Sequence, residues 1–122
     1  MKPIRLVLVE DNQVFRTTLE LLLGLQDDIE IVASVDSGTR APEIVQELGP
    51  DVVLLDYRLP GMNGLEVTRE LRNASPEVAV VCLTASVSRT EVAELYEAGA
   101  VACLMKDEAL EEIVAAIHQA VA

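Results

Sequence analysis

Aromatic residues are scarce in this sequence, and their scarcity argues against one class of binding surface. The 122 residues include one phenylalanine, two tyrosines and no tryptophan. Proteins that bind single-stranded nucleic acid stack the bases on aromatic side chains, so a stacking surface of that kind is not expected. Hydrophobic residues still make up 51% of the chain, which indicates a folded domain with an aliphatic core.

Positive charge is also in short supply. The chain carries 9 lysines and arginines against 21 aspartates and glutamates, a formal net charge of −12. Phosphate backbones and anionic lipids repel such a surface, so we expect this segment to bind neither nucleic acid nor membrane directly. An acidic chain can nevertheless hold divalent cations where several carboxylates converge.

Cysteines and long apolar runs are few as well. Cys82 and Cys103 lie in apolar runs without a CxxC motif or a Cys/His cluster, so we expect buried, reduced thiols. The longest uncharged stretch, residues 78–88, is too short to span a bilayer. The apolar run that follows Lys2 and Arg5 is too short for a signal peptide. We therefore expect a cytoplasmic protein.

Short apolar runs alternate with amphipathic stretches along the whole chain. The runs are Ile4–Val9, Ile29–Val35, Val52–Leu55, Val78–Leu83 and Val101–Leu104. They are rich in valine, isoleucine and leucine without strict alternation, as in strands covered on both faces. Five strands and five helices in βα order predict one α/β domain: a parallel sheet with right-handed crossovers and helices on both faces.

Proline and glycine agree with this division. Helix ends are predicted at Gly49-Pro50, Ser75-Pro76 and Gly99. Pro42 is expected in the first turn of the second helix. Tyr96 falls on the apolar stripe of the fourth helix, which predicts a core position.

Polar residues stand where four of the predicted strands end. They are Glu10 and Asp11 after the first strand, Asp56 after the third, Thr84 after the fourth and Lys106 after the fifth. In a parallel α/β sheet, ligands bind outside the carboxyl ends of the strands, at the topological switch point. We therefore expect these side chains to share one pocket.

The chemistry of such a pocket follows from its charges. Carboxylates brought close together repel one another, and an oxygen-liganded Mg²⁺ removes that cost. Asp56 beside the metal can act as a nucleophile toward phosphorus and form an aspartyl phosphate. Lys106 would stabilise charge on the phosphoryl oxygens, and the Thr84 hydroxyl would donate to one of them.

Each of these residues also has an ordinary structural interpretation. Asp56 could be a turn residue, Glu10-Asp11-Asn12 could cap the first helix, Thr84 could cap the fourth, and Lys106 could be a solvated lysine. Those interpretations do not account for all of them falling at one predicted sheet edge, so the shared pocket is favoured.

The motifs and their order give the chain a family resemblance over its whole length. They are Leu8–Asn12, Leu55–Glu66, Leu83–Ala85, Ala98–Ala100 and Leu104–Asp107. With these, the chain resembles the receiver domains of bacterial two-component response regulators. The loop after Asp56 is most similar to that of regulators with a LuxR-type helix-turn-helix output domain.

The resemblance implies a flavodoxin-like fold with strand order 2-1-3-4-5 and a role in a phosphorelay. Asp56 would take the phosphoryl group from the phosphohistidine of a sensor histidine kinase. Asp11 and Asp56 would bind Mg²⁺, for which Mn²⁺ can substitute, together with the backbone carbonyl of Arg58. Glu10 would act on the metal through water. The protein would be a switch in transcription regulation, and not a turnover enzyme.

The resemblance also implies how the signal leaves the site. Thr84 would be the switch hydroxyl, Lys106 would pair with the phosphoryl group, and the surface near helix four, strand five and helix five would change. Arg58 and Ser86 stand at positions that tune the phosphoryl lifetime. Receivers usually carry an aromatic ring at the position of Cys103, so the aromatic half of the switch is missing. Tyr96 is an alternative reporter on helix four.

The remaining expectations concern boundaries and partners. Residues 1–122 would form a single receiver domain without an output domain, which suggests a piece of a longer regulator. Phosphorylation could produce a homodimer through helix one or helix five. His118 is expected to be a surface residue and not a ligand.

Three alternative functions have to be compared with the sequence. A phosphatase with an aspartate nucleophile would need a second aspartate where Arg58 stands. A nucleotide or flavin binder would need a glycine-rich loop after the first strand, and that loop has none. The main alternative is a pseudo-receiver that acts only as a protein–protein interaction module. Cys103 is the reason for it, because receivers usually carry an aromatic ring at that position.

Overall fold

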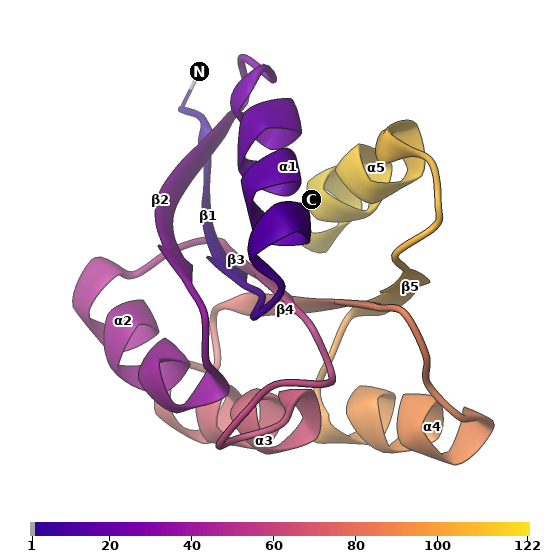
Figure 1. Ribbon diagram of the computed structural model, residues 1–122. Helices are drawn as coiled ribbons and strands as arrows, with labels where there is room; N and C mark the ends of the chain where they lie inside the picture. The colour runs from indigo at the N-terminus through magenta and orange to yellow at the C-terminus, as the bar shows by residue number, and fades with distance from the viewer. Residues whose placement is uncertain (1) are drawn as a thin grey trace.

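The computed structural model describes residues 2–122 and places all five strands in one parallel sheet. The strands are β1 (Ile4–Val9), β2 (Ile29–Val35), β3 (Val52–Leu55), β4 (Ala79–Thr84) and β5 (Ala102–Met105). Their order in the sheet is β2-β1-β3-β4-β5, so the predicted topology is confirmed (Figure 1). The first three strands have the predicted limits, whereas β4 and β5 begin and end one residue later.

Five helices cover the two faces of the sheet. They are α1 (Gln13–Gly24), α2 (Ala41–Leu48), α3 (Gly64–Ala74), α4 (Arg89–Ala98) and α5 (Leu110–Ala120). Helices α1 and α5 lie on one face, and α2, α3 and α4 lie on the other (Figure 1). A short 3₁₀ helix, Gly38–Arg40, precedes α2 and was not predicted. Among residues 2–122, no helix is both long and apolar enough to cross a membrane.

Each face of the sheet has its own aliphatic core, because neighbouring residues of a strand point to opposite sides. In β1, Val7 and Val9 join the core under α2, α3 and α4, while Leu6 and Leu8 join the core under α1 and α5. All four residues of β3 have no exposed surface. The central strand therefore fixes the position of the residue that follows it, Asp56.

The predicted helix ends are confirmed. Pro42 lies in the first turn of α2, where its missing N–H is not needed. Gly49 and Gly99 end α2 and α4 with left-handed backbone angles, φ 56° and 118°, which glycine adopts without strain. Ser75 ends α3. Local chain chemistry therefore sets these boundaries.

The prediction that Tyr96 is a core residue is wrong, since its side chain is 48% exposed. Only Leu95 of α4 is buried, because this helix covers the end of the sheet where β5 is the edge strand. The Tyr96 hydroxyl instead accepts a hydrogen bond from the Cys103 N–H of β5, at 3.1 Å. Tyr96 therefore links α4 to the edge strand from the surface.

Candidate functional site

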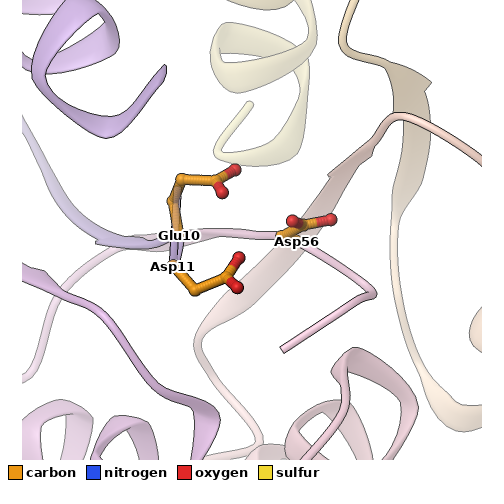
Figure 2. Close-up of side chains that lie close together, drawn as sticks. All are labelled: Glu10, Asp11 and Asp56. Atoms are coloured by element: carbon orange, nitrogen blue, oxygen red, sulfur yellow. The ribbon is translucent and has the colours of Figure 1, made fainter. Parts of the chain in front are cut away.

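Three carboxylates meet at the carboxyl end of the central strands. Glu10 and Asp11 follow β1, Asp56 follows β3, and one oxygen of each lies within 4.8 Å of the others. Figure 2 shows the Glu10 and Asp11 side chains turned to the same space as Asp56. Glu10 and Asp56 are buried, while Asp11 is exposed at the mouth of the site. The sheet topology brings together the acidic residues as predicted.

Lys106 joins the two buried carboxylates. Its Nζ lies 2.7 Å from Oε1 of Glu10 and 3.0 Å from Oδ2 of Asp56. Burial alone would lower the pKa of this lysine, but its hydrogen bonds to the two carboxylates outweigh burial and raise the pKa. Lys106 is therefore an ammonium ion held by two carboxylates. The alternative interpretation, a lysine solvated at the surface, does not apply.

The environment of Glu10 disfavours its charge. Its side chain is 2% exposed, and burial raises the pKa of the carboxyl despite the hydrogen bonds from Lys106 and from the Asn12 N–H. The nearby charge of Asp56 raises it further. Since a shift in this direction means that the ionised form is the less favoured one in the folded protein, a bound cation would stabilise the ionised form.

Asp56 is held by the loop that follows it. Its Oδ1 accepts a hydrogen bond from the Arg58 N–H at 3.3 Å, and Oδ2 accepts one from Lys106. The loop turns back so closely that a Cβ at Gly64 would lie 2.7 Å from the Asp56 carbonyl oxygen and from Cα of Tyr57. Only glycine fits there, so this position shapes the loop around the phosphoacceptor candidate.

Thr84 is the last residue of β4 and is fully buried. Its hydroxyl donates a long hydrogen bond, 3.4 Å, to the carbonyl of Ser86 in the following loop, and the Ser86 side chain is exposed. Lys106 N–H donates to the Thr84 carbonyl at 2.9 Å. The hydroxyl is weakly held next to the site, which leaves it free to change partner.

The structure excludes helix capping as the role of Glu10, Asp11 and Thr84. Asn12 caps α1, accepting from the Phe15 N–H at 2.9 Å, and Ser88, not Thr84, caps α4. Glu10 and Asp11 are therefore not used as caps.

Two residues that sequence reasoning did not assign touch the site. The Phe15 ring lies under Lys106, with 4.7 Å from Nζ to the ring centroid, and the Arg16 guanidinium donates to the Glu10 carbonyl at 2.7 Å. Both stand on the first turn of α1, directly after the acidic pair. The helical spacing of Phe15 with Leu19, Leu22 and Leu23 indicates only a core position for Phe15.

Glu91 is a third unassigned residue. It stands in the first turn of α4 and forms a bidentate ion pair with Arg58, with Nη–Oε distances of 2.9 and 3.1 Å. The Arg58 guanidinium also lies over the Tyr57 ring, 4.7 Å from its centroid. The S-x-x-E capping pattern of residues 88–91 was a readable signal for Glu91 at a helix start, but not for its pairing with Arg58.

Environments were also predicted for the two cysteines and for the histidine. Both cysteines are free thiols; burial raises the pKa of Cys82 to about 12 and also raises that of Cys103, which is half-buried on β5. His118 lies at the surface as predicted, and its Nε2 is 2.6 Å from Oδ2 of Asp28. That partner was not anticipated, because it is distant in sequence.

The donor set fits a hard divalent cation. It consists of carboxylate oxygens only, and the exposed Asp11 leaves one side open to water. Mg²⁺ favours oxygen ligands and retains several waters.

This arrangement coincides with a known family. The family model of the response regulator receiver domain matches residues 6–118 of this chain. The chain belongs to the receiver domains of two-component response regulators. Its five-stranded parallel sheet has the strand order 2-1-3-4-5, and its fold matches that of a solved receiver domain.

Individual relatives agree with this assignment. The nitrate/nitrite response regulator protein NarL of Escherichia coli is 34% identical over 121 residues, which are 99% of this receiver domain and 56% of NarL. Response regulator GacA of Pseudomonas aeruginosa is 35% identical over 116 residues, 95% of this chain and 54% of GacA. The chain thus spans about half the length of these curated relatives.

Solved structures extend the likeness to three dimensions. The signal receiver domain of the putative response regulator NarL from Mycobacterium tuberculosis has a TM-score of 0.94 at 31% identity, covering 99% of this chain and 98% of that one. A DNA-binding response regulator of the LuxR family from Staphylococcus aureus has a TM-score of 0.92 at 30% identity, with 98% and 99% covered. The flavodoxin-like fold is therefore confirmed.

Proposed function

We propose that this receiver domain is a phosphorylation-dependent switch whose Asp56 accepts a phosphoryl group from the phosphohistidine of a sensor histidine kinase in the cytoplasm. One observation carries the proposal: the Asp56 carboxylate lies in a group of three carboxylates and is contacted by the Lys106 ammonium at 3.0 Å. This combines a nucleophile, a cation that neutralises phosphoryl charge and ligands for a divalent metal.

In the transfer step, an oxygen of Asp56 forms a bond to phosphorus while the bond from phosphorus to the histidine nitrogen of the kinase breaks. The nitrogen keeps the electron pair, and Asp56 becomes an acyl phosphate. Bound by Asp11, Asp56 and the Arg58 carbonyl, with Glu10 acting through water, Mg²⁺ or Mn²⁺ would neutralise charge on the transferred group.

Lys106 and Thr84 act on the product. The Lys106 ammonium, already oriented by Glu10 at 2.7 Å, stabilises the negative charge on the phosphoryl oxygens. The Thr84 hydroxyl leaves the Ser86 carbonyl, to which it is bound at 3.4 Å, and donates to a phosphoryl oxygen. The exposed Ser86 and the half-exposed Arg58 set how easily water reaches the acyl phosphate.

The movement of Thr84 and its loop would alter the surface near α4, β5 and α5. Residues 1–122 act as one receiver unit, and the output is transcription regulation. The chain is a switch that catalyses its own phosphoryl transfer, and not a turnover enzyme. It contacts DNA through no surface of its own, since its charge is −12.

A homodimer formed on phosphorylation is part of the proposal. Helix α1 and its C-cap residue expose three large apolar side chains, Val14, Leu21 and Leu25, at 77%, 66% and 70%. The helix lies on the same face of the sheet as α5 (Figure 1). Sedimentation velocity with and without a phosphoryl mimic tests the pairing. An unchanged sedimentation coefficient would refute it.

The phosphoacceptor itself is tested by intact-mass measurement after incubation with acetyl phosphate and Mg²⁺. The wild-type chain should gain one base-labile phosphoryl group, and Asp56→Asn should gain none. Asp51→Asn is the matched control, because Asp51 is an exposed aspartate at the opposite end of the same strand. Absence of any gain in the wild type would favour a pseudo-receiver that acts only by protein contact.

A further inference from the structure

The Arg58–Glu91 pair connects two segments that phosphorylation is expected to affect. Arg58 lies in the loop after β3, two residues beyond Asp56, and Glu91 lies in the first turn of α4. Both guanidinium Nη atoms contact the carboxylate, at 2.9 and 3.1 Å. The pair therefore spans the gap between the site and the helix whose surface would carry the signal.

Glu91 is held in this geometry from its own helix as well. Its Oε1 accepts the Ser88 N–H at 2.8 Å, and its own N–H donates to the Ser88 hydroxyl at 3.1 Å, which completes a capping box. The Ser88 hydrogen bond lowers the pKa of the Glu91 carboxyl, as does the guanidinium, and the Tyr57 hydroxyl acts in the same direction. Glu91 is thus a fixed anion that faces Arg58.

Arg58 is the exchangeable partner. Its side chain is 55% exposed, so it moves at little desolvation cost, whereas Lys106 is already bound to Glu10 and Asp56. A phosphoryl group on Asp56 adds roughly 1.5 to 2 negative charges and three acceptor oxygens. Guanidinium groups bind phosphoryl oxygens in bidentate fashion, so the modified Asp56 competes with Glu91 for Arg58.

We propose that Glu91 is a positioning residue: it holds the Arg58 guanidinium away from Asp56 in the unphosphorylated protein, and phosphorylation draws Arg58 to the phosphoryl group and frees the first turn of α4. This inference rests on the proposed phosphoacceptor function of Asp56. It gives a route from the site to α4 that needs no aromatic ring at Cys103.

Beryllofluoride, a phosphoryl mimic, tests this in the presence of Mg²⁺ by fluorine NMR titration. Glu91→Gln keeps an oxygen for the Ser88 N–H but loses the charge that holds Arg58, so it should lower the half-saturating beryllofluoride concentration about threefold, the scale of an exposed bidentate pair. Glu97→Gln makes the same charge change at an exposed position of the same helix and should leave it unchanged.

The decisive variant is Arg58→Gln combined with Glu91→Gln. If Glu91 acts through Arg58, Glu91→Gln does not change the half-saturating beryllofluoride concentration in the Arg58→Gln background. Hydrogen exchange in residues 89–92 gives a second readout: Glu91→Gln speeds it when Arg58 is present and has no effect on it when Arg58 is replaced. Equal effects of Glu91→Gln in both backgrounds would mean that Glu91 acts only in the capping box of α4 and would overturn the inference. A Glu91→Gln titration that matches the wild type would also overturn it. Failure of the wild type to bind beryllofluoride would overturn the phosphoacceptor function together with it.

Discussion

Two groups of charged side chains lie at the site, and they differ mainly in their contact with water: Lys106 with Glu10 and Asp56, and Arg58 with Glu91. On one side, the Lys106 side chain is 17% exposed, and its partners Glu10 and Asp56 are 2% and 4% exposed. On the other, Arg58 and Glu91 are 55% and 22% exposed. The nitrogen–oxygen distances in the two groups are similar, so exposure to solvent is the main difference between them.

The buried group fixes the site, and the exposed pair is suited to exchange. Removing Lys106 would leave the two buried carboxylates Glu10 and Asp56 without their cation, and an uncompensated buried charge costs several kcal/mol. An exposed pair contributes about 0.2–1 kcal/mol and is screened by salt. Lys106 would therefore be needed in every state of the receiver domain, whereas Arg58 can change partner when the charge at Asp56 changes.

The largest effect is expected from Lys106→Met. Loss of the ammonium removes the one side-chain cation that contacts Asp56 among residues 2–122, and the initial rate of phosphorylation by acetyl phosphate should fall about 100-fold, as for loss of a preorganised donor. Lys2→Met is the matched control, since Lys2 is the other lysine of the chain and is exposed. A rate within twofold of wild type would remove Lys106 from the mechanism.

An intermediate effect is expected from Glu10→Gln on stability. Because the folded-state pKa of Glu10 is raised above 4.5, the folded protein binds more protons than the unfolded chain in the interval above that value. The free energy of unfolding of the metal-free wild type should therefore fall as the pH rises from about 4.5 through the folded-state pKa. Glu10→Gln should lack this fall and be about 1 kcal/mol more stable at neutral pH.

Urea unfolding at several pH values in the presence of a chelator measures this difference. Glu30→Gln changes the same charge at an exposed position of β2 and serves as the control, with a pH profile that follows the wild type. A Glu10→Gln variant that is less stable than wild type at neutral pH would mean that the ion pair with Lys106 outweighs burial. The conclusion that the surroundings of Glu10 disfavour its charge would then be wrong.

The smallest effect is expected from Arg58→Gln on stability. Loss of the exposed pair should lower the free energy of unfolding by about 0.5 kcal/mol at low salt, and the difference should shrink at high salt because exposed charges are screened. Thermal unfolding at low and high ionic strength is the measurement. A loss of several kcal/mol that does not depend on salt would show that this pair belongs with the buried group.

Much of this structure was predictable from the sequence, because local chain chemistry and sheet topology determine it. Glycine and proline set the helix ends, apolar runs set the strands, and parallel topology brings the residues after β1 and β3 to one edge. The convergence of Glu10, Asp11 and Asp56 needed no knowledge of side-chain conformation. It follows from the order of the strands.

The contacts that were not predicted depend on side chains that reach between elements. Arg58 and Glu91 are separated by 33 residues, and which carboxylate an arginine selects is not encoded in either local pattern. Tyr96 was misassigned because its stripe on α4 faces the edge strand β5, where one side of the helix stays open. Periodicity identifies the apolar side of a helix but not how far the sheet extends beneath it.

Borohydride reduction of the acetyl phosphate-treated protein is the most direct test of the central claim, because it converts an aspartyl phosphate to homoserine at the modified residue. Tandem mass spectrometry of the digested protein should find homoserine at position 56 and at no other aspartate, with none when Mg²⁺ is withheld. Homoserine at Asp11, at Asp51 or at no position would contradict the assignment of Asp56 as the phosphoacceptor.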